Sequence, residues 1–344
     1  MLDVAVKPPP DVAPKPPLMR LLPTLFTLLL ALCAWPCHAA DEFLPGIKRI
    51  VFLGDSITHG GGYVEDFELY LLTRYPARRF EIIDLGLSSE TVSGLSEEGH
   101  AGGKFPRPDL HERLDRALPK TKPDLVFACY GMNDGIYLPL DEERFAKFRD
   151  GIHWLHDKVT AAGAQIIHLT PPTFHSLAAR PTPGPDGKPP ASMLGGYNQV
   201  LDQYAAWLLD QRAQGWRVID IHGPMNAFIE GQRKSNPDFV FAKDGVHPNA
   251  EGHALIADQI ISALAPNDAA WWQKLRAELA ANPKGAELRK LIHEDVHVLG
   301  DAWLTDVGHK RPGVNPGLPL PEAEARAAEV ETKIHALVAE LHPG

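Results

Sequence analysis

The chain has 344 residues, of which 44% are hydrophobic and 23% charged, and its formal net charge is −10. These proportions are typical of a soluble globular protein with one large domain or two ordinary ones. The acidic balance and the lack of long basic runs argue against nucleic acid or an anionic membrane surface as the main partner, because both favour clustered Lys and Arg.

The first 40 residues have the pattern of a leader. Arg20 precedes an apolar run from Leu21 to Trp35, and Cys37-His38-Ala39-Ala40 supplies small residues for cleavage. This pattern predicts a cleavable signal peptide and an exported protein, periplasmic or secreted, without stable membrane insertion. Met19 stands directly before Arg20, which favours a start at that methionine. A membrane anchor is the alternative, but the apolar run is short for a bilayer span.

From about residue 47, apolar runs alternate with longer amphipathic stretches. Five runs are typical of strands buried on both faces: Arg49–Leu53, Phe80–Leu85, Asp124–Tyr130, Ala164–Thr170 and Trp216–Ile221. Helical spacing of apolar residues is found in Val64–Tyr75, Pro108–Pro119, Asp141–Ala162, Tyr197–Gln214 and Asn249–Leu264. Such a series predicts an α/β fold with a mainly parallel sheet and helices on both faces.

Two segments depart from this alternation. Residues 176–196 are rich in Pro and Gly and predict a loop near the carboxyl end of the fourth strand. From Ala265 onward no strand-like run occurs, and the sequence predicts helices packed on the main domain, with the Trp271-Trp272 pair as an anchor. The predicted organisation is a leader over 1–40, an α/β domain over 47–264 and a helical C-terminal extension over 265–344.

Polar residues follow several of the predicted strands. Gly54-Asp55-Ser56 comes after the first, Gly86 to Thr91 after the second, Gly131 to Gly135 after the third, and Asp244 to Pro248 after the fifth and just before the last helix of the domain. Loops at the carboxyl ends of parallel strands meet at one edge of the sheet, around the point where the strand order reverses. We therefore expect these residues to form one site.

The residue types at this site point to acyl transfer. Ser56 can act as a nucleophile once His247 takes its proton, and Asp244 can orient the imidazole. The oxyanion of a tetrahedral intermediate needs hydrogen-bond donors. The side-chain amide of Asn133 and the backbone N–H groups of Ser56 and of the Gly86–Ser89 loop are the candidates.

These four motifs resemble blocks of the SGNH (GDSL-type) hydrolases over about residues 47–264. The resemblance implies a three-layer α/β/α sandwich with a flavodoxin-like sheet and ester hydrolysis without a metal or another cofactor. It implies a triad of Ser56, Asp244 and His247, and an oxyanion hole of Ser56, Asn133 and the second block. In that block Ser89 stands where the family has a glycine, so Ser89 is the first candidate donor and Gly86 the second.

One competing motif lies in the C-terminal extension. His293-Glu294-Asp295-Val296-His297 matches H-E-x-x-H, a zinc-binding helix signature of metalloproteases. Position 303, where a third histidine ligand would stand, is Trp. A charged helix face is therefore the favoured interpretation, and no metal is expected.

For the substrate, the expected export and the resemblance favour a small-molecule or carbohydrate ester, above all an acetyl ester. A lipid-directed acylhydrolase and a non-catalytic carbohydrate-binding protein are the alternatives, and the oligomeric state stays open. The residues that we expect near the substrate are His100, His111, Tyr63, Arg107 and Tyr137.

Overall fold

The computed structural model describes residues 43–174 and 196–341. The predicted leader and nearly all of the predicted loop at 176–196 lie outside these residues. In the described part of the chain, no helix has the length and apolar character needed to cross a membrane.

The centre of the fold is a parallel sheet of five strands in the order β2-β1-β3-β4-β5. The strands are β1 (Arg49–Gly54), β2 (Glu81–Asp84), β3 (Leu125–Cys129), β4 (Gln165–Leu169) and β5 (Arg217–Ile219). All five predicted strands are confirmed, with shorter ends in four of them. The strand order is the flavodoxin-like one. It reverses between β1 and β3, and in open α/β sheets ligands bind beyond the carboxyl ends of the strands at such a point.

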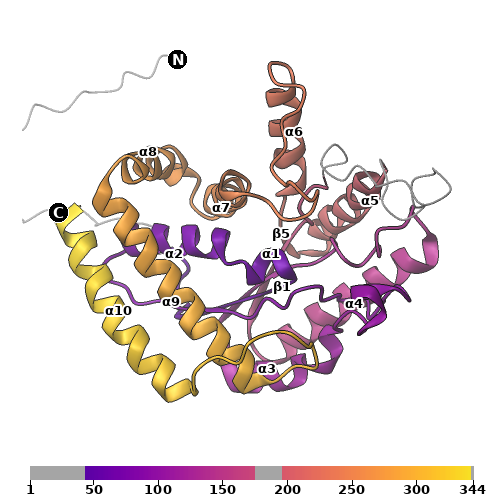
Figure 1. Ribbon diagram of the computed structural model, residues 1–344, viewed down its shortest axis with the longest axis horizontal. Coiled ribbons are helices and arrows are strands. Elements are labelled where there is room, and N and C mark those ends of the chain that lie inside the picture. The colour runs from indigo at the N-terminus through magenta and orange to yellow at the C-terminus, as the bar shows by residue number, and fades with distance from the viewer. Residues whose placement is uncertain (1–42, 175–195, 342–344) are drawn as a thin grey trace, which may run out of the picture. The chain divides into compact units, whose positions relative to one another are not determined.

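Helices cover both faces of this sheet, as predicted. They are α1 (Ser56–His59), α2 (Gly62–Arg74), α3 (Leu114–Thr121), α4 (Glu142–Ala161), α5 (Tyr197–Asp210), α6 (His222–Arg233) and α7 (Ala250–Leu264). Figure 1 shows α2 and α7 on one face of the sheet and α3 and α4 on the other. Helix α6 is not among the predicted helices: it has Gly223 and Pro224 in its first turn and only a narrow apolar buried stripe, Met225 and Ile229.

Side-chain caps define where several helices begin. Asp141 accepts a hydrogen bond from the N–H of Arg144 at the start of α4, and Asn249 accepts one from Gly252 at the start of α7. Such caps satisfy N–H groups that the first helical turn leaves unpaired. The helix predicted over Pro108–Pro119 is wrong at its start: Asp109 caps a separate 3₁₀ turn over Leu110–Glu112, and α3 follows it.

The C-terminal helices pack on this domain, as predicted. They are α8 (Ala269–Ala280), α9 (Pro283–Val307) and α10 (Leu320–Leu341). Trp272 of α8 is buried, and its Nε1–H donates to Asp258 of α7 at 2.8 Å. Helix α9 packs against α2 and the edge strand β2, and α10 lies along α9 (Figure 1).

Aromatic side chains fill the core between the sheet and α2. The rings of Phe52 on β1 and Phe127 on β3 stack with their centroids 4.9 Å apart, and Phe67 of α2 meets Phe127 edge-on at 5.5 Å. Burying each of these side chains stabilises the fold by about 1.5–3 kcal/mol. A rigid support of this kind fixes the end of β1, where the site begins.

Candidate active site

Ser56 is the first residue after β1 that points toward solvent. Gly54 ends the strand, and a Cβ at this position would lie 2.0 Å from Thr58 Oγ1 and 2.9 Å from the carbonyl oxygen of Cys129. Asp55 then caps the short helix α1 by accepting a hydrogen bond from the N–H of Ile57 at 2.9 Å. The turn therefore needs glycine at position 54, and it leaves Ser56 half-buried at the carboxyl edge of the sheet.

The structure brings Ser56, His247 and Asp244 into one chain of hydrogen bonds. Ser56 Oγ lies 2.7 Å from His247 Nε2, although the two residues are 191 positions apart in the sequence. His247 Nδ1 lies 2.5 Å from Asp244 Oδ2. An imidazole in this position can take the hydroxyl proton of Ser56 through one nitrogen while a carboxylate orients it through the other.

Asp244 is built to stay ionised. Its Oδ1 accepts the backbone N–H groups of Val246 and His247, each at 2.9 Å. Partial burial works against the charge, but the hydrogen bonds from the side chain and backbone of His247 outweigh it and lower the pKa of Asp244. An ionised carboxylate holds the His247 ring with Nδ1 protonated, which leaves Nε2 free to accept a proton.

Asn133 lies in the loop after β3, almost fully buried, and its amide orientation is set by its neighbours. Its Oδ1 accepts hydrogen bonds from Arg107 at 2.8 Å and from the hydroxyl of Tyr137 at 3.1 Å. Because a guanidinium only donates, the amide oxygen must face Arg107 and the NH₂ group must face the other way. That NH₂ group lies 3.3 Å from both Asp55 Oδ2 and the carbonyl oxygen of Glu90.

The amide of Asn133 thus connects Asp55, which precedes Ser56, with Glu90, which follows Ser89. In the described residues, the backbone N–H groups of Ser56 and Ser89 donate to no protein acceptor. The N–H of Gly86, in contrast, donates to Asp84 Oδ1 at 2.7 Å. Of the two candidate donors in the second block, Ser89 alone has an N–H group without an acceptor among residues 43–174 and 196–341. Ser89 has a φ of +69°, the left-handed region in which the family pattern has glycine.

A buried ion pair supports the loop that contains Ser89. Glu90 and Arg113 are both almost fully buried, and two guanidinium nitrogens of Arg113 donate to the two carboxylate oxygens of Glu90 at 2.7 Å. The hydroxyl of Tyr130 donates to the same carboxylate at 2.7 Å. Paired and hydrogen-bonded in this way, a buried charge is tolerated, and the Glu90 backbone stays in reach of Asn133.

The residues expected near the substrate have other contacts. Tyr63 is fully buried, and its hydroxyl lies 2.9 Å from Thr58 Oγ1. His111 stacks on Trp154 with ring centroids 3.8 Å apart, and His100 pairs with Glu97. Arg107 and Tyr137 hold Asn133, as described above. The structure therefore gives Arg107 a structural task at the site that its sequence position did not reveal.

The H-E-x-x-H residues form helix–helix contacts. His293 Nδ1 lies 2.7 Å from Glu65 Oε1 of α2, and His297 Nε2 lies 3.4 Å from the same atom. These three side chains are a set among the described residues whose ligand atoms could hold a metal ion. Glu294 pairs with Arg326 of α10 at 2.7 Å, away from the two histidines, so it does not take the place of a metalloprotease base.

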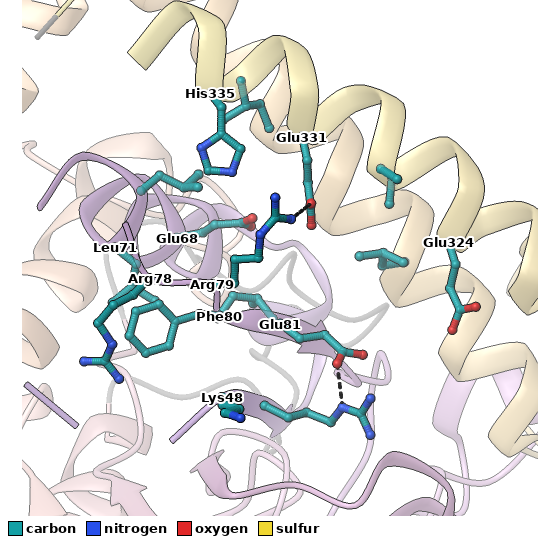
Figure 2. Close-up of a pocket in the computed structure, with 17 residues that line it drawn as sticks. Lys48, Glu68, Leu71, Arg78, Arg79, Phe80, Glu81, Glu324, Glu331 and His335 are labelled. Carbon is teal, nitrogen blue, oxygen red and sulfur yellow. Dashed lines mark hydrogen bonds and ion pairs between the residues drawn. The ribbon is translucent and has the colours of Figure 1, made fainter. Parts of the chain in front are cut away.

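A cavity of about 470 Å³ lies elsewhere, between the amino-terminal ends of β1 and β2 and helix α10. Figure 2 shows Arg79 paired with Glu331, and Glu81 paired with an arginine, which is Arg49 of β1. None of Ser56, Asp244 and His247 lines this cavity. The candidate active site lies instead at the opposite edge of the sheet, where Asp244 and His247 are exposed to solvent.

Comparisons with known proteins identify a family for the chain. The chain matches the model of the GDSL-like lipase/acylhydrolase family over residues 52–255, which is more than half of its length and contains Ser56, Ser89, Asn133, Asp244 and His247. No curated protein matches the chain.

Several solved structures match the chain. BT4096, a gut microbial diltiazem-metabolizing enzyme, is 21% identical with a TM-score of 0.52, and the match covers 64% of this chain and 48% of BT4096. The chain thus spans about half the length of that protein. A catalytic mutant of Axe2, an acetylxylan esterase from Geobacillus stearothermophilus, is 20% identical with a TM-score of 0.44, and the match covers 63% of this chain and 94% of Axe2. The acetyl xylan esterase AlAXEase is 20% identical with a TM-score of 0.46, and the match covers 62% of this chain and 98% of AlAXEase.

Proposed function

The chain belongs to the GDSL-like lipase/acylhydrolase family, and we propose that it is an exported serine esterase that removes short acyl groups, above all acetyl, from carbohydrate. As a family member it is a carboxylic ester hydrolase. The observation that carries the proposed mechanism is the hydrogen-bonded chain from Ser56 through His247 to Asp244, beside two backbone N–H groups that have no acceptor in the described part of the chain.

In the acylation step, His247 Nε2 takes the proton of Ser56 Oγ as this oxygen attacks the ester carbonyl carbon. The ionised carboxylate of Asp244 stabilises the resulting imidazolium. When the tetrahedral intermediate collapses, the bond to the alcohol oxygen breaks and His247 returns its proton to that oxygen. The products are the free alcohol and an acyl group bound to Ser56.

Water then takes the place of the alcohol. His247 removes a proton from the water as it attacks the acyl carbon, and the same proton returns to Ser56 when the acid leaves. In both steps the carbonyl oxygen becomes negatively charged. The N–H groups of Ser56 and Ser89 and the amide of Asn133 are the proposed donors to this oxyanion, each with an effect of about 3 kcal/mol on the transition state.

The exposure of the site supports a large alcohol part. The side chains of Asp244 and His247 are 53% and 51% exposed. A polysaccharide chain can lie against such an open edge while a small acyl group enters toward Ser56. The preference for acetyl groups also follows from the predicted export and from the family resemblance.

Replacement of Ser56 tests the mechanism. Ser56→Ala should lower kcat for p-nitrophenyl acetate by about 10⁴-fold or more, and the protein should unfold at the same temperature. Ser235→Ala, an exposed serine just beyond α6, is the matched control and should keep wild-type activity. A phosphonate ester should label Ser56, and a chelator should leave turnover unchanged. Turnover that survives in Ser56→Ala contradicts the mechanism.

Two further measurements test the finer proposals. A series of p-nitrophenyl esters should show the highest kcat/KM for acetate, and acetate should be released from acetylated xylan. Activity that rises beyond butyrate would identify a lipid-directed acylhydrolase instead, and binding of xylan without any turnover would identify a binding protein. For export, N-terminal sequencing of the protein recovered outside the cytoplasm should begin after the predicted leader.

A further inference from the structure

One arginine beyond the family-matched residues contacts the loop of the candidate oxyanion hole. Arg311 lies in the connection between α9 and α10, more than 50 residues past the end of the family match at residue 255. Its Nε–H donates to the backbone carbonyl oxygen of Ser88 at 2.7 Å. Figure 1 shows this connection as a loop between the end of α9 and the start of α10.

The carbonyl of Ser88 and the N–H of Ser89 belong to the same peptide group. The described residues contain no cis peptide bond, so this group is trans and its C=O and N–H point in opposite directions. A donor that holds the carbonyl on one side therefore fixes the direction of the N–H on the other. That N–H is the proposed oxyanion donor of the loop, and in the described residues it has no protein acceptor.

The backbone conformation of Ser89 makes a hydrogen bond that fixes the Ser88–Ser89 peptide necessary. Its φ of +69° lies in the left-handed region, which is unfavourable for a residue with a Cβ. A change of φ at Ser89 would relieve this strain. The same change would turn the Ser88–Ser89 peptide and move its N–H group. A glycine, which the family pattern has here, would carry no such penalty.

Arg311 is itself held in place. Its guanidinium lies over the ring of Phe105, 5.5 Å from the centroid. Its Nη1–H donates to the carbonyl oxygen of Pro312 at 2.9 Å. Its backbone N–H donates to His309 Nδ1 at 3.2 Å. The side chain is half-buried, so its hydrogen bond to Ser88 is less weakened by solvent than one at the surface.

The two ends of the loop are thus held by different parts of the chain. Arg113 of the family-matched domain holds the side chain of Glu90, as described above, whereas Arg311 of the C-terminal region holds the backbone of Ser88. The positive charge of Arg311 also polarises the Ser88–Ser89 peptide, which strengthens its N–H as a donor.

We propose that Arg311 is a positioning residue for ester hydrolysis: it aims the Ser89 N–H at the oxyanion and so replaces the conformational support that glycine gives elsewhere in the family. The C-terminal region then completes the catalytic site without touching the substrate. This inference rests on the proposed function.

The test replaces Arg311 and separates kcat from KM. Arg311→Met keeps the packing on Phe105 and removes the donors. It should lower kcat for p-nitrophenyl acetate about tenfold with KM within about twofold, because one oxyanion donor is misdirected while two remain; complete loss of a donor costs about 10²–10³. Arg311→Lys, which keeps the charge and one donor, should lower kcat about threefold. Lys310→Met, an exposed neighbour with the same loss of charge, is the control and should match the wild type.

A second readout reports on the oxyanion hole alone. A boronic acid that forms a tetrahedral adduct on Ser56 should bind about tenfold more weakly to Arg311→Met than to Lys310→Met, whereas a purely structural role would leave its affinity unchanged. In a Ser89→Gly background, which relieves the left-handed strain, the effect of Arg311→Met on kcat should shrink to about threefold.

The outcomes are distinct. If the wild type hydrolyses the ester and Arg311→Met and Lys310→Met have equal kcat values, the inference is overturned and the proposed function stands. No turnover by the wild type overturns the proposed function and the inference with it. If Arg311→Met does not fold, Arg311→Lys decides, and a wild-type kcat in that variant overturns the inference.

Discussion

Two regions of the candidate site differ in how they meet solvent. Asp244 and His247 stand half exposed at the open edge of the sheet, whereas Glu90 and Arg113, which support the loop of the oxyanion hole, are almost completely buried. An exposed group can be lost without leaving an unpaired charge in the interior, but a buried ion pair cannot lose one partner at so low a cost. The reactive groups and the groups that position them should therefore respond to mutation in opposite ways.

The largest expected effect is on activity alone. His247→Ala removes the base and should lower kcat for p-nitrophenyl acetate by about 10⁴-fold or more. Its midpoint of urea unfolding should stay close to that of the wild type, because the side chain is half exposed. His335→Ala, which alters the distant cavity of Figure 2, is the control for activity. A His247→Ala protein that unfolds much more easily would contradict the separation between the two regions.

The next effect is on stability. Arg113→Met leaves the carboxylate of Glu90 buried without its ion-pair partner and should lower the free energy of unfolding by about 3–5 kcal/mol. Lys274→Met removes a lysine from an exposed pair with Glu278 and should leave the unfolding free energy nearly unchanged. Urea unfolding of both variants gives the comparison. Equal stabilities would show that the buried pair does not support the fold.

The smallest effect concerns pH. Burial raises the pKa of Asp84 from 3.8 to about 7, so between these pH values the native protein keeps a proton that the unfolded chain has lost. This contribution to stability is present at low pH and falls as the pH rises toward about 7. Asp84→Asn cannot ionise, so it should reduce the loss of stability between pH 5 and 8, by on the order of 1–3 kcal/mol. Urea unfolding at the two pH values tests this, and an unchanged difference contradicts it.

The sequence allowed the sheet and the reactive edge to be predicted because both are encoded locally. A buried parallel strand is a short apolar run, and Ser56 and Asn133 each follow such a run within a few residues, whereas His247 stands just before the last predicted helix of the domain. The contacts that position these groups are not encoded in this way. Arg107 and Asn133 are 26 positions apart and Arg311 and Ser88 are 223 apart, and no local pattern marks an arginine that will meet a distant carbonyl or amide.

The two errors in the predicted helices have local causes. Helix α6 was not predicted because its buried stripe is narrow and its first turn contains Gly223 and Pro224. The start of α3 was placed too early because Pro108 fits a helix start, whereas Asp109 caps a separate turn. In the second block, the sequence showed a serine in place of glycine, but only the structure shows that Ser89 adopts the conformation of a glycine.

The packing of α9 on β2 has a consequence for the solubility of the protein. β2 is an edge strand, and α9 approaches its backbone so closely that a Cβ at Gly300 would lie 3.0 Å from the carbonyl oxygen of Asp84. An uncovered strand edge is a template on which a second chain can add a strand. A chain cut back to the family-matched residues would lose this cover, and we expect it to aggregate edge to edge.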